Sequence, residues 1–219
     1  KDGKHTVRKY PAASAAAAHI EALAENECVF TERFKGSTLS VNRLELKRNP
    51  DGLPFAEIEY LENSRTLEEL LDECLQNNDE AGFDKLFDRY CKIAAWKAEG
   101  TKQDYDLTFP NICVQGDIWT MIDYEWTTDK LTPQQIISRA LNCYGQEEPV
   151  RMEHAIVKKH LAALGIGKEQ MRELSEKELA FQRFVLQEKD GRSRTALGQL
   201  RHLIGNRAVP YQEFFARAD

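Results

Sequence analysis

Hydrophobic and polar residues alternate in several short stretches before residue 62 and recur mainly at helical spacing after it. The segment 5–10 alternates as a strand does, and two further apolar-alternating runs lie at 28–30 and 39–46. The turn at 49–52 then leads into another strand-like segment at 54–61. Four apolar residues of these runs are expected to line one small antiparallel sheet: Leu44, Leu46, Phe55 and Ile58.

The rest of the pattern predicts helices. Ser14 can cap a helix that continues to about Asn26 through an alanine-rich segment. Thr66 begins a capping-box pattern, so a helix is expected from there to about Asn77. Thr132 followed by proline marks the start of another helix. The helices expected after Asn77 cover 79–98, 133–144, 153–164, 175–188, 196–204 and 211–216.

A short hairpin is predicted between two β-prone runs, 112–114 and 118–122. The residues between them, 115–117, predict a three-residue turn with Gly116 at a position that favours a positive φ. The helix expected at 79–98 has one apolar face and would lie beneath the polar loop that leads into this hairpin.

Polar residues with oxygen ligands stand at both ends of this hairpin. A hairpin folds its ends together, so Asn111 is expected to lie close to Asp123, with Asp106 held nearby by the preceding loop. Two carboxylates and an amide oxygen form a hard-oxygen site of the kind that Mg²⁺ takes, usually with phosphates completing its coordination. The alternative is an ordinary turn, in which Asp and Asn are common residues.

Composition narrows the class of protein. With 219 residues, 42% hydrophobic and 30% charged, the chain is long enough for one large or two small lobes of an ordinary soluble protein. The net charge of -6 gives no electrostatic case for nucleic acid as a partner. No apolar run approaches the length that a transmembrane segment needs. The five cysteines are widely spaced without a CxxC pair, which favours a reducing cytoplasm.

The loop and hairpin resemble the catalytic core of the protein-kinase-like superfamily. The catalytic loop of that superfamily reads Asp-Leu-x-x-x-Asn, and the six residues from Asp106 to Asn111 match it position for position. Its metal-binding Asp follows a short hairpin after a hydrophobic residue, as Asp123 follows Ile122. The sequence Asp-Tyr-Glu at 123–125 looks like the small-molecule kinases of the aminoglycoside and choline type.

This resemblance implies an α+β, two-lobed fold with a truncated small β-containing N-lobe at 1–62 and a larger, mostly helical C-lobe at 63–219. The nucleotide cleft would lie between the lobes. Asp106 would orient or deprotonate the acceptor hydroxyl, and Asn111 and Asp123 would hold the Mg²⁺ that bridges the phosphates of ATP.

The resemblance also implies a lysine on the nucleotide phosphates, and Lys9 is the candidate because Arg8 should point to the opposite face of its strand. Glu21 or Glu25 could pair with Lys9, while His19 stands where the superfamily usually has that glutamate. The segment 59–63 falls where the superfamily has its adenine-binding hinge. On local evidence alone, a surface lysine on an edge strand explains Lys9 equally well.

The chain departs from the superfamily in three ways. Asp104 stands where kinases usually have His, and Glu125 stands where protein kinases have Gly. The only glycine ahead of Lys9 is Gly3, so the glycine-rich hairpin that covers the phosphates is missing from this sequence. We therefore expect the chain to be a piece of a longer polypeptide; the alternative is a cleft that lacks this cover.

The short link from Asp123 to Thr132 leaves no long activation segment for a peptide substrate, which favours a compact acceptor or no substrate at all. The stretch 110–127 looks like kinase-like domains of bacterial multidomain glycosyltransferases or methyltransferases of surface-polysaccharide assembly. That resemblance implies a cytoplasmic ATP/Mg-dependent phosphotransferase beside a fused or neighbouring transferase domain, acting on a hydroxyl of a small molecule or glycan. The alternatives are a catalytically inactive kinase-like scaffold attached to a transferase and an unrelated helical interaction module.

Overall fold

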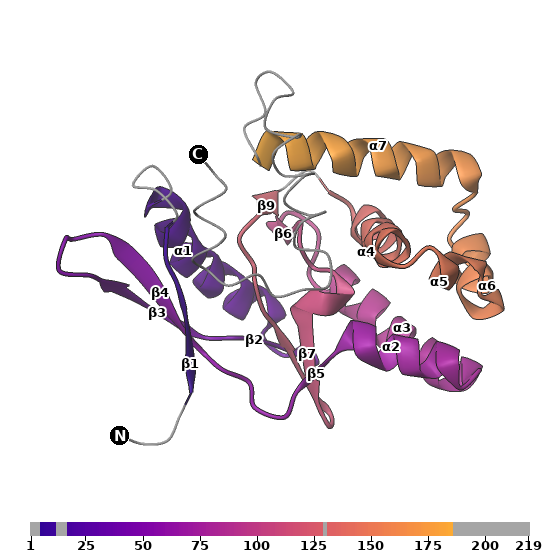
Figure 1. Ribbon diagram of the computed structural model, residues 1–219, viewed down its shortest axis with the longest axis horizontal. Helices are drawn as coiled ribbons and strands as arrows, with labels where there is room; N and C mark the ends of the chain where they lie inside the picture. The colour runs from indigo at the N-terminus through magenta and orange to yellow at the C-terminus, as the bar shows by residue number, and fades with distance from the viewer. Residues whose placement is uncertain (1–4, 12–16, 129–130, 186–219) are drawn as a thin grey trace, which may run out of the picture. The chain divides into compact units, whose positions relative to one another are not determined.

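The computed structural model describes residues 5–11, 17–128 and 131–185 (Figure 1). These residues form a mixed α+β fold, as the sequence predicts. The chain divides into two compact units between Met171 and Arg172. The lobe boundary expected at residue 62 stays a prediction.

The first sheet confirms the strand pattern near the start of the chain. It contains β1 (Thr6–Lys9), β4 (Pro54–Glu59) and β3 (Leu44–Arg48), antiparallel in the order β1-β4-β3. The apolar residues expected in one small sheet all lie on β3 and β4. Lys9 lies opposite Ala56, whereas Arg8 lies opposite Glu57 and pairs with it, so the two basic side chains point to opposite faces.

Helix α1 (Ala17–Phe34) lies beside this sheet and contacts β4 and β3 (Figure 1). It is longer than predicted, because it continues past Asn26 through the run 28–30 that was expected to alternate as a strand. The reason is burial: Leu23, Phe30 and Phe34 are 2%, 0% and 3% exposed and recur at helical spacing, so one face of the longer helix is covered.

The second sheet holds the predicted hairpin. Its order is β2 (Leu39–Val41), β8 (Ile118–Met121), β7 (Ile112–Gln115) and β5 (Arg65–Thr66). The run 39–46, which reads as one alternating stretch, divides between β2 and β3 in different sheets. Strand β2 pairs with β8 in parallel, and β7 pairs with β8 antiparallel.

The hairpin turn is one residue shorter than predicted. Gln115 pairs with Ile118, so the loop consists of Gly116 and Asp117. Gly116 has a φ of +58°, the left-handed conformation that the sequence led us to expect at this residue.

Helices make up most of the rest of the described chain. The helices are α2 (Leu67–Gln76), α3 (Glu80–Ala95), α4 (Pro133–Glu147), α5 (Val150–Glu153), α6 (Ala155–Ala163) and α7 (Lys168–Val185). Helices α2 and α3 pack on each other. Thr66 and Thr132 each form the reciprocal capping box at the start of a helix, α2 and α4 respectively. The expected helix 153–164 is divided at His154, whose Nδ1 accepts the Ile156 N–H, and the helix expected from 175 starts earlier. The segments 196–204 and 211–216 lie outside the described residues.

Aromatic rings form the core beneath the loop that precedes the hairpin. The Tyr90 ring of α3 lies 4.9 Å from that of Phe109, which lies 5.4 Å from that of Tyr144. The buried Tyr90 hydroxyl donates a hydrogen bond of 2.6 Å to the Leu107 carbonyl. Helix α3 therefore supports the loop, as its apolar face led us to expect.

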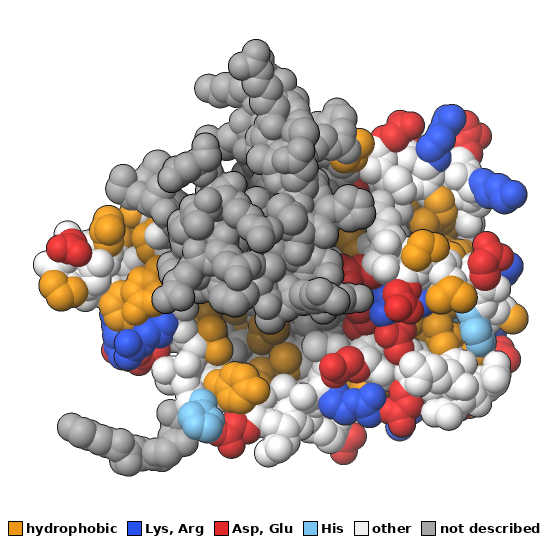
Figure 2. Space-filling model, viewed as in Figure 1, with side chains coloured by type: hydrophobic (Ala, Val, Ile, Leu, Met, Phe, Trp, Pro, Cys, Tyr) orange, Lys and Arg blue, Asp and Glu red, His pale blue; other side chains and the backbone are white. Residues whose placement is uncertain are grey.

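The surface of the described residues carries charges of both signs. Figure 2 shows Lys and Arg side chains interspersed with Asp and Glu, without a broad basic area on the part of this face that is not grey. That distribution agrees with the net charge of -6. Among the residues that the structure describes, no helix is both long enough and apolar enough to cross a membrane.

Candidate functional site

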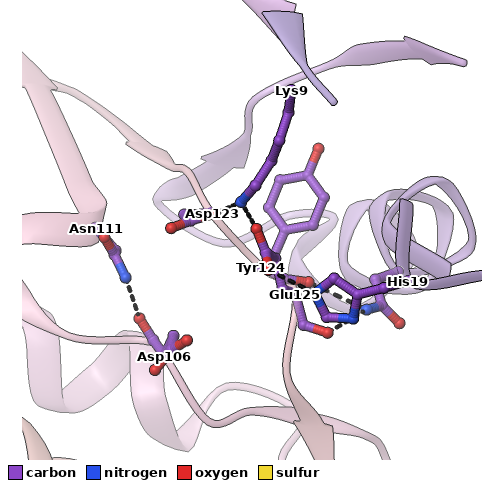
Figure 3. Close-up of polar contacts among 8 residues, drawn as sticks. Lys9, His19, Asp106, Asn111, Asp123, Tyr124 and Glu125 are labelled. Carbon is purple, nitrogen blue, oxygen red and sulfur yellow. Dashed lines mark hydrogen bonds and ion pairs between the residues drawn. The ribbon is translucent and has the colours of Figure 1, made fainter. Parts of the chain in front are cut away.

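The loop before the hairpin is fixed by buried apolar residues. Leu107 and Phe109 are both 0% exposed, and a short 3-10 helix, η2 (Phe109–Asn111), begins at Phe109. The side-chain nitrogen of Asn111 donates a hydrogen bond of 2.9 Å to the Asp106 carbonyl (Figure 3). This bond uses the amide nitrogen of Asn111, so its amide oxygen is the side-chain atom that can act as a metal ligand.

The hairpin brings its two ends together, as the sequence predicts. Beyond the last strand pair, the Ile122 N–H donates a hydrogen bond of 2.9 Å to the Asn111 carbonyl. Asp123 then adopts a φ of +56°, a left-handed conformation that Asp tolerates better than most residues. This turn ends the strand and leaves the Asp123 side chain 50% exposed.

A cleft of about 460 Å³ adjoins this end of the hairpin. Lys9, Asn111 and Asp123 all line it, so the structure brings together three of the residues predicted to bind a nucleotide and its metal. The expected hinge contributes 59–61 to the lining, and apolar side chains such as Leu23 and Ile122 cover much of the rest. The volume falls within the range of small-molecule sites, roughly 300–1,000 Å³.

Lys9 forms two ion pairs at the edge of the cleft (Figure 3). Its Nζ lies 2.7 Å from Oδ1 of Asp123 and also pairs with the Glu125 carboxylate. The other Glu125 oxygen, Oε2, lies 2.5 Å from Nε2 of His19 on α1. Lys9 and His19, which come from different elements, thus meet through Glu125.

The structure does not place Glu21 at Lys9. The Glu21 carboxylate lies 2.6 Å from the guanidinium of Arg48, and Glu25 is exposed. Residues that stand two positions apart on a helix point to different sides. Because His19 points toward Lys9, Glu21 points elsewhere. Sequence reasoning missed Glu125 as the partner, although the departure from glycine at this position drew attention to it.

Hydrogen bonds hold the segment after the hairpin against both α1 and the opposite wall of the cleft. Asn26, only 4% exposed, donates from Nδ2 to the carbonyls of Tyr124 and Glu125 at 3.1 and 3.2 Å. The Tyr124 hydroxyl donates to the Asn42 carbonyl at 2.6 Å, and Asn42 donates from Nδ2 to the Glu59 carbonyl at 2.9 Å. Burial raises the pKa of Tyr124, so this hydroxyl keeps its proton at neutral pH.

Asp106 carries an ion pair of its own. Its Oδ1 lies 3.2 Å from Nη2 of Arg139 on α4, and the Arg139 guanidinium lies 3.8 Å from the centre of the Tyr105 ring. The Asp106 side chain keeps 23% of its surface exposed. It does not itself line the cleft, but its carbonyl holds Asn111, which does.

Asp104 contacts Asp106 and is fully buried, at 0% exposed. It belongs to the short strand β6 (Gln103–Asp104), which pairs with β9 (Thr127–Thr128). Its Oδ1 accepts the Asp106 N–H at 3.0 Å, and its Oδ2 has no hydrogen-bond partner within the described residues. Burial raises the pKa of Asp104, and the negative charge of Asp106 adds to the effect.

Asp104→Asn should stabilise the protein at pH 7 and have almost no effect near pH 4. Between the ordinary Asp pKa of about 4 and the raised folded pKa, the folded state keeps a proton that the unfolded chain has released, so stability falls as pH rises. The asparagine side chain of the variant cannot titrate, and we expect a gain of roughly 1–3 kcal/mol at pH 7 in urea unfolding. Equal stability of both proteins at pH 7 would contradict this. The exposed control Asp51→Asn should change stability by less than about 0.5 kcal/mol.

The donor set at the cleft fits a magnesium–nucleotide complex better than an all-protein metal site. Across the residues that the structure describes, no group of three or more His, Cys, Asp or Glu side chains could hold a metal ion. Asn111 and Asp123 supply two oxygen ligands, and Mg²⁺ commonly takes one or two protein ligands while phosphates and water complete its shell.

The arrangement therefore places a lysine cation and two hard-oxygen ligands on the lining of one cleft, with a partly exposed carboxylate in the adjoining loop. Such a set can bind a phosphorylated ligand with a divalent cation and can position a hydroxyl beside it. Compared with models of known protein families and with curated proteins, the chain has no match.

Proposed function

We propose that this chain is an ATP- and Mg²⁺-dependent phosphotransferase-like domain acting on a hydroxyl of a small molecule or glycan. The observation that carries the proposal is the convergence of Lys9, Asn111 and Asp123 on one cleft of about 460 Å³. Lys9 and Asp123 are 114 positions apart in the sequence. The protein-kinase-like two-lobed arrangement is part of this proposal.

Each residue has a distinct role in the proposed reaction. Asn111 and Asp123 would hold Mg²⁺, which supplies positive charge to the phosphates when bound. Lys9 would contact the phosphates directly, and the segment 59–61 would lie beside the base of the nucleotide. Asp106 would orient the acceptor hydroxyl and accept its proton. Most of the rate gain would then come from positioning and charge neutralisation.

The acceptor is proposed to be compact. The link from Asp123 to α4 is short, and its segment 127–128 is paired with β6, which leaves little chain to receive a peptide. By the sequence resemblance, the proposal extends to a cytoplasmic bacterial protein with a fused or neighbouring transferase domain.

Mg–ATP should stabilise the chain in a thermal unfolding experiment. At a ligand concentration of 100 times Kd, a single site adds roughly 2.7 kcal/mol to the free energy of unfolding. We expect the rise in Tm to saturate and to require both the nucleotide and the metal, because each supplies part of the other's binding site. A flat response across millimolar Mg–ATP would remove the proposal.

A second candidate is a catalytically inactive kinase-like scaffold that binds nucleotide weakly or not at all. Its support is that both candidate acids are already paired, Asp123 with Lys9 and Asp106 with Arg139. A bound metal would have to displace Lys9 from Asp123. The same thermal series distinguishes the two candidates, since a scaffold gives the flat response.

A further inference from the structure

The Lys9 ammonium has two acidic partners, and only one of them can stay with it when the cleft is filled. Asp123 is the proposed metal ligand and is 50% exposed, whereas the Glu125 side chain is only 13% exposed and points toward α1 (Figure 3). A divalent cation at Asp123 repels an ammonium group at the same carboxylate. Lys9 therefore needs another negative partner in the loaded state.

Helix α1 holds Glu125 at two points, its side chain and its backbone. A carboxylate only accepts hydrogen bonds, so Nε2 of His19, at 2.5 Å from Oε2 of Glu125, acts as the donor. The backbone carbonyl of Glu125 accepts a second hydrogen bond from Asn26, which lies on the same helix as His19. Helix α1 thus fixes both the backbone and the side chain of Glu125.

We propose that Glu125, held by His19, is the positioning residue that keeps the Lys9 ammonium in the cleft while Asp123 engages the metal–nucleotide complex. The inference rests on the proposed function and names a part of its site that the sequence did not predict. His19 acts through Glu125 and does not touch the ligand.

The His19 ring has a second contact that offers a competing explanation. Its centre lies 4.7 Å from that of the Trp126 ring, so His19 could matter only as a packing group. Two substitutions separate these roles. His19→Gln keeps a side-chain N–H donor at a similar reach but loses the ring, and His19→Phe keeps a ring against Trp126 but loses the donor.

The test is a calorimetric titration of the full chain with Mg–ATP. We expect His19→Phe and the isosteric Glu125→Gln each to weaken binding roughly tenfold, the effect of one charge-assisted hydrogen bond or ion pair. His19→Gln should retain most of the affinity. Glu21→Gln is the matched control. It removes a carboxylate from α1, the helix that carries His19, but that carboxylate pairs with Arg48 and not with Lys9. Melting curves without nucleotide check that each variant is folded.

The possible results separate this inference from the proposed function. If the unaltered chain binds Mg–ATP and both His19→Phe and Glu125→Gln bind equally well, the positioning role fails and the proposed function stands. If His19→Gln loses affinity while His19→Phe retains it, the ring packing and not the hydrogen bond is responsible, and the inference is overturned. If the unaltered chain does not bind, both proposals fail together.

Discussion

Asp123→Ala is expected to abolish the stabilisation of the chain by Mg–ATP. The substitution removes the one acidic metal ligand proposed at the cleft and leaves only the amide oxygen of Asn111. Neutral amides alone bind Mg²⁺ weakly in water, since the ion gives up its water molecules reluctantly. The stabilisation of roughly 2.7 kcal/mol expected at 100 times Kd should fall to none.

The measurement is the Tm of both proteins across a series of Mg–ATP concentrations. Asp117→Ala is the matched control, because Asp117 is an exposed acid at the opposite end of the same hairpin. It changes the net charge equally and should retain the full rise in Tm. A normal rise in Asp123→Ala would show that the phosphates are held without this carboxylate and would remove the proposed metal site.

Arg33→Leu is expected to cause the largest loss of stability among the substitutions considered. Arg33 is 4% exposed, and its guanidinium donates to the carbonyls of Ala94, Trp96 and Lys102 at 3.1 to 3.2 Å. The first two carbonyls lie at the C-terminal end of α3, where no helical partner is available. Leucine would leave three acceptors without their donor, at a cost of roughly 1–3 kcal/mol for each buried one.

We expect the free energy of unfolding to fall by roughly 3 kcal/mol or more in urea. Burial lowers the pKa of Arg33 to about 10, so the guanidinium remains charged at pH 7 and the loss does not depend on pH near neutrality. Arg48→Leu is the control: this exposed arginine pairs with Glu21 at the surface, and its loss should cost less than about 1 kcal/mol. Equal losses in the two variants would show that Arg33 does not cap α3.

Sequence reasoning succeeded where the cause of a structure is local. The capping residues Thr66 and Thr132 stand within three positions of the groups that they bond, so the helix starts could be predicted. The hairpin ends meet because a tight turn requires it, which is why Asn111 and Asp123 could be expected on one site. The alternation of side chains along a strand likewise predicted opposite directions for Arg8 and Lys9.

Sequence reasoning failed where contacts between distant segments of the chain determine the structure. The run 28–30 favours a strand locally, but the burial of Phe30 within a helical face prevails. Nothing near Leu39 indicates that β2 pairs in parallel with β8, which follows much later in the chain. For the same reason, the partner of Lys9 could not be chosen among nearby glutamates, since Glu125 reaches it from a segment far along the sequence.

The hydrogen bonds from Tyr124 to Asn42 and from Asn42 to Glu59 have a consequence for how a ligand would enter. They connect the segment after the hairpin to the strand that forms the facing wall, so widening the space between them requires these bonds to break. A ligand that enters therefore meets a binding surface whose shape already exists, and little conformational entropy is lost on association. Tyr124→Phe removes the first connection, so this variant should bind the same ligand with a larger entropy loss.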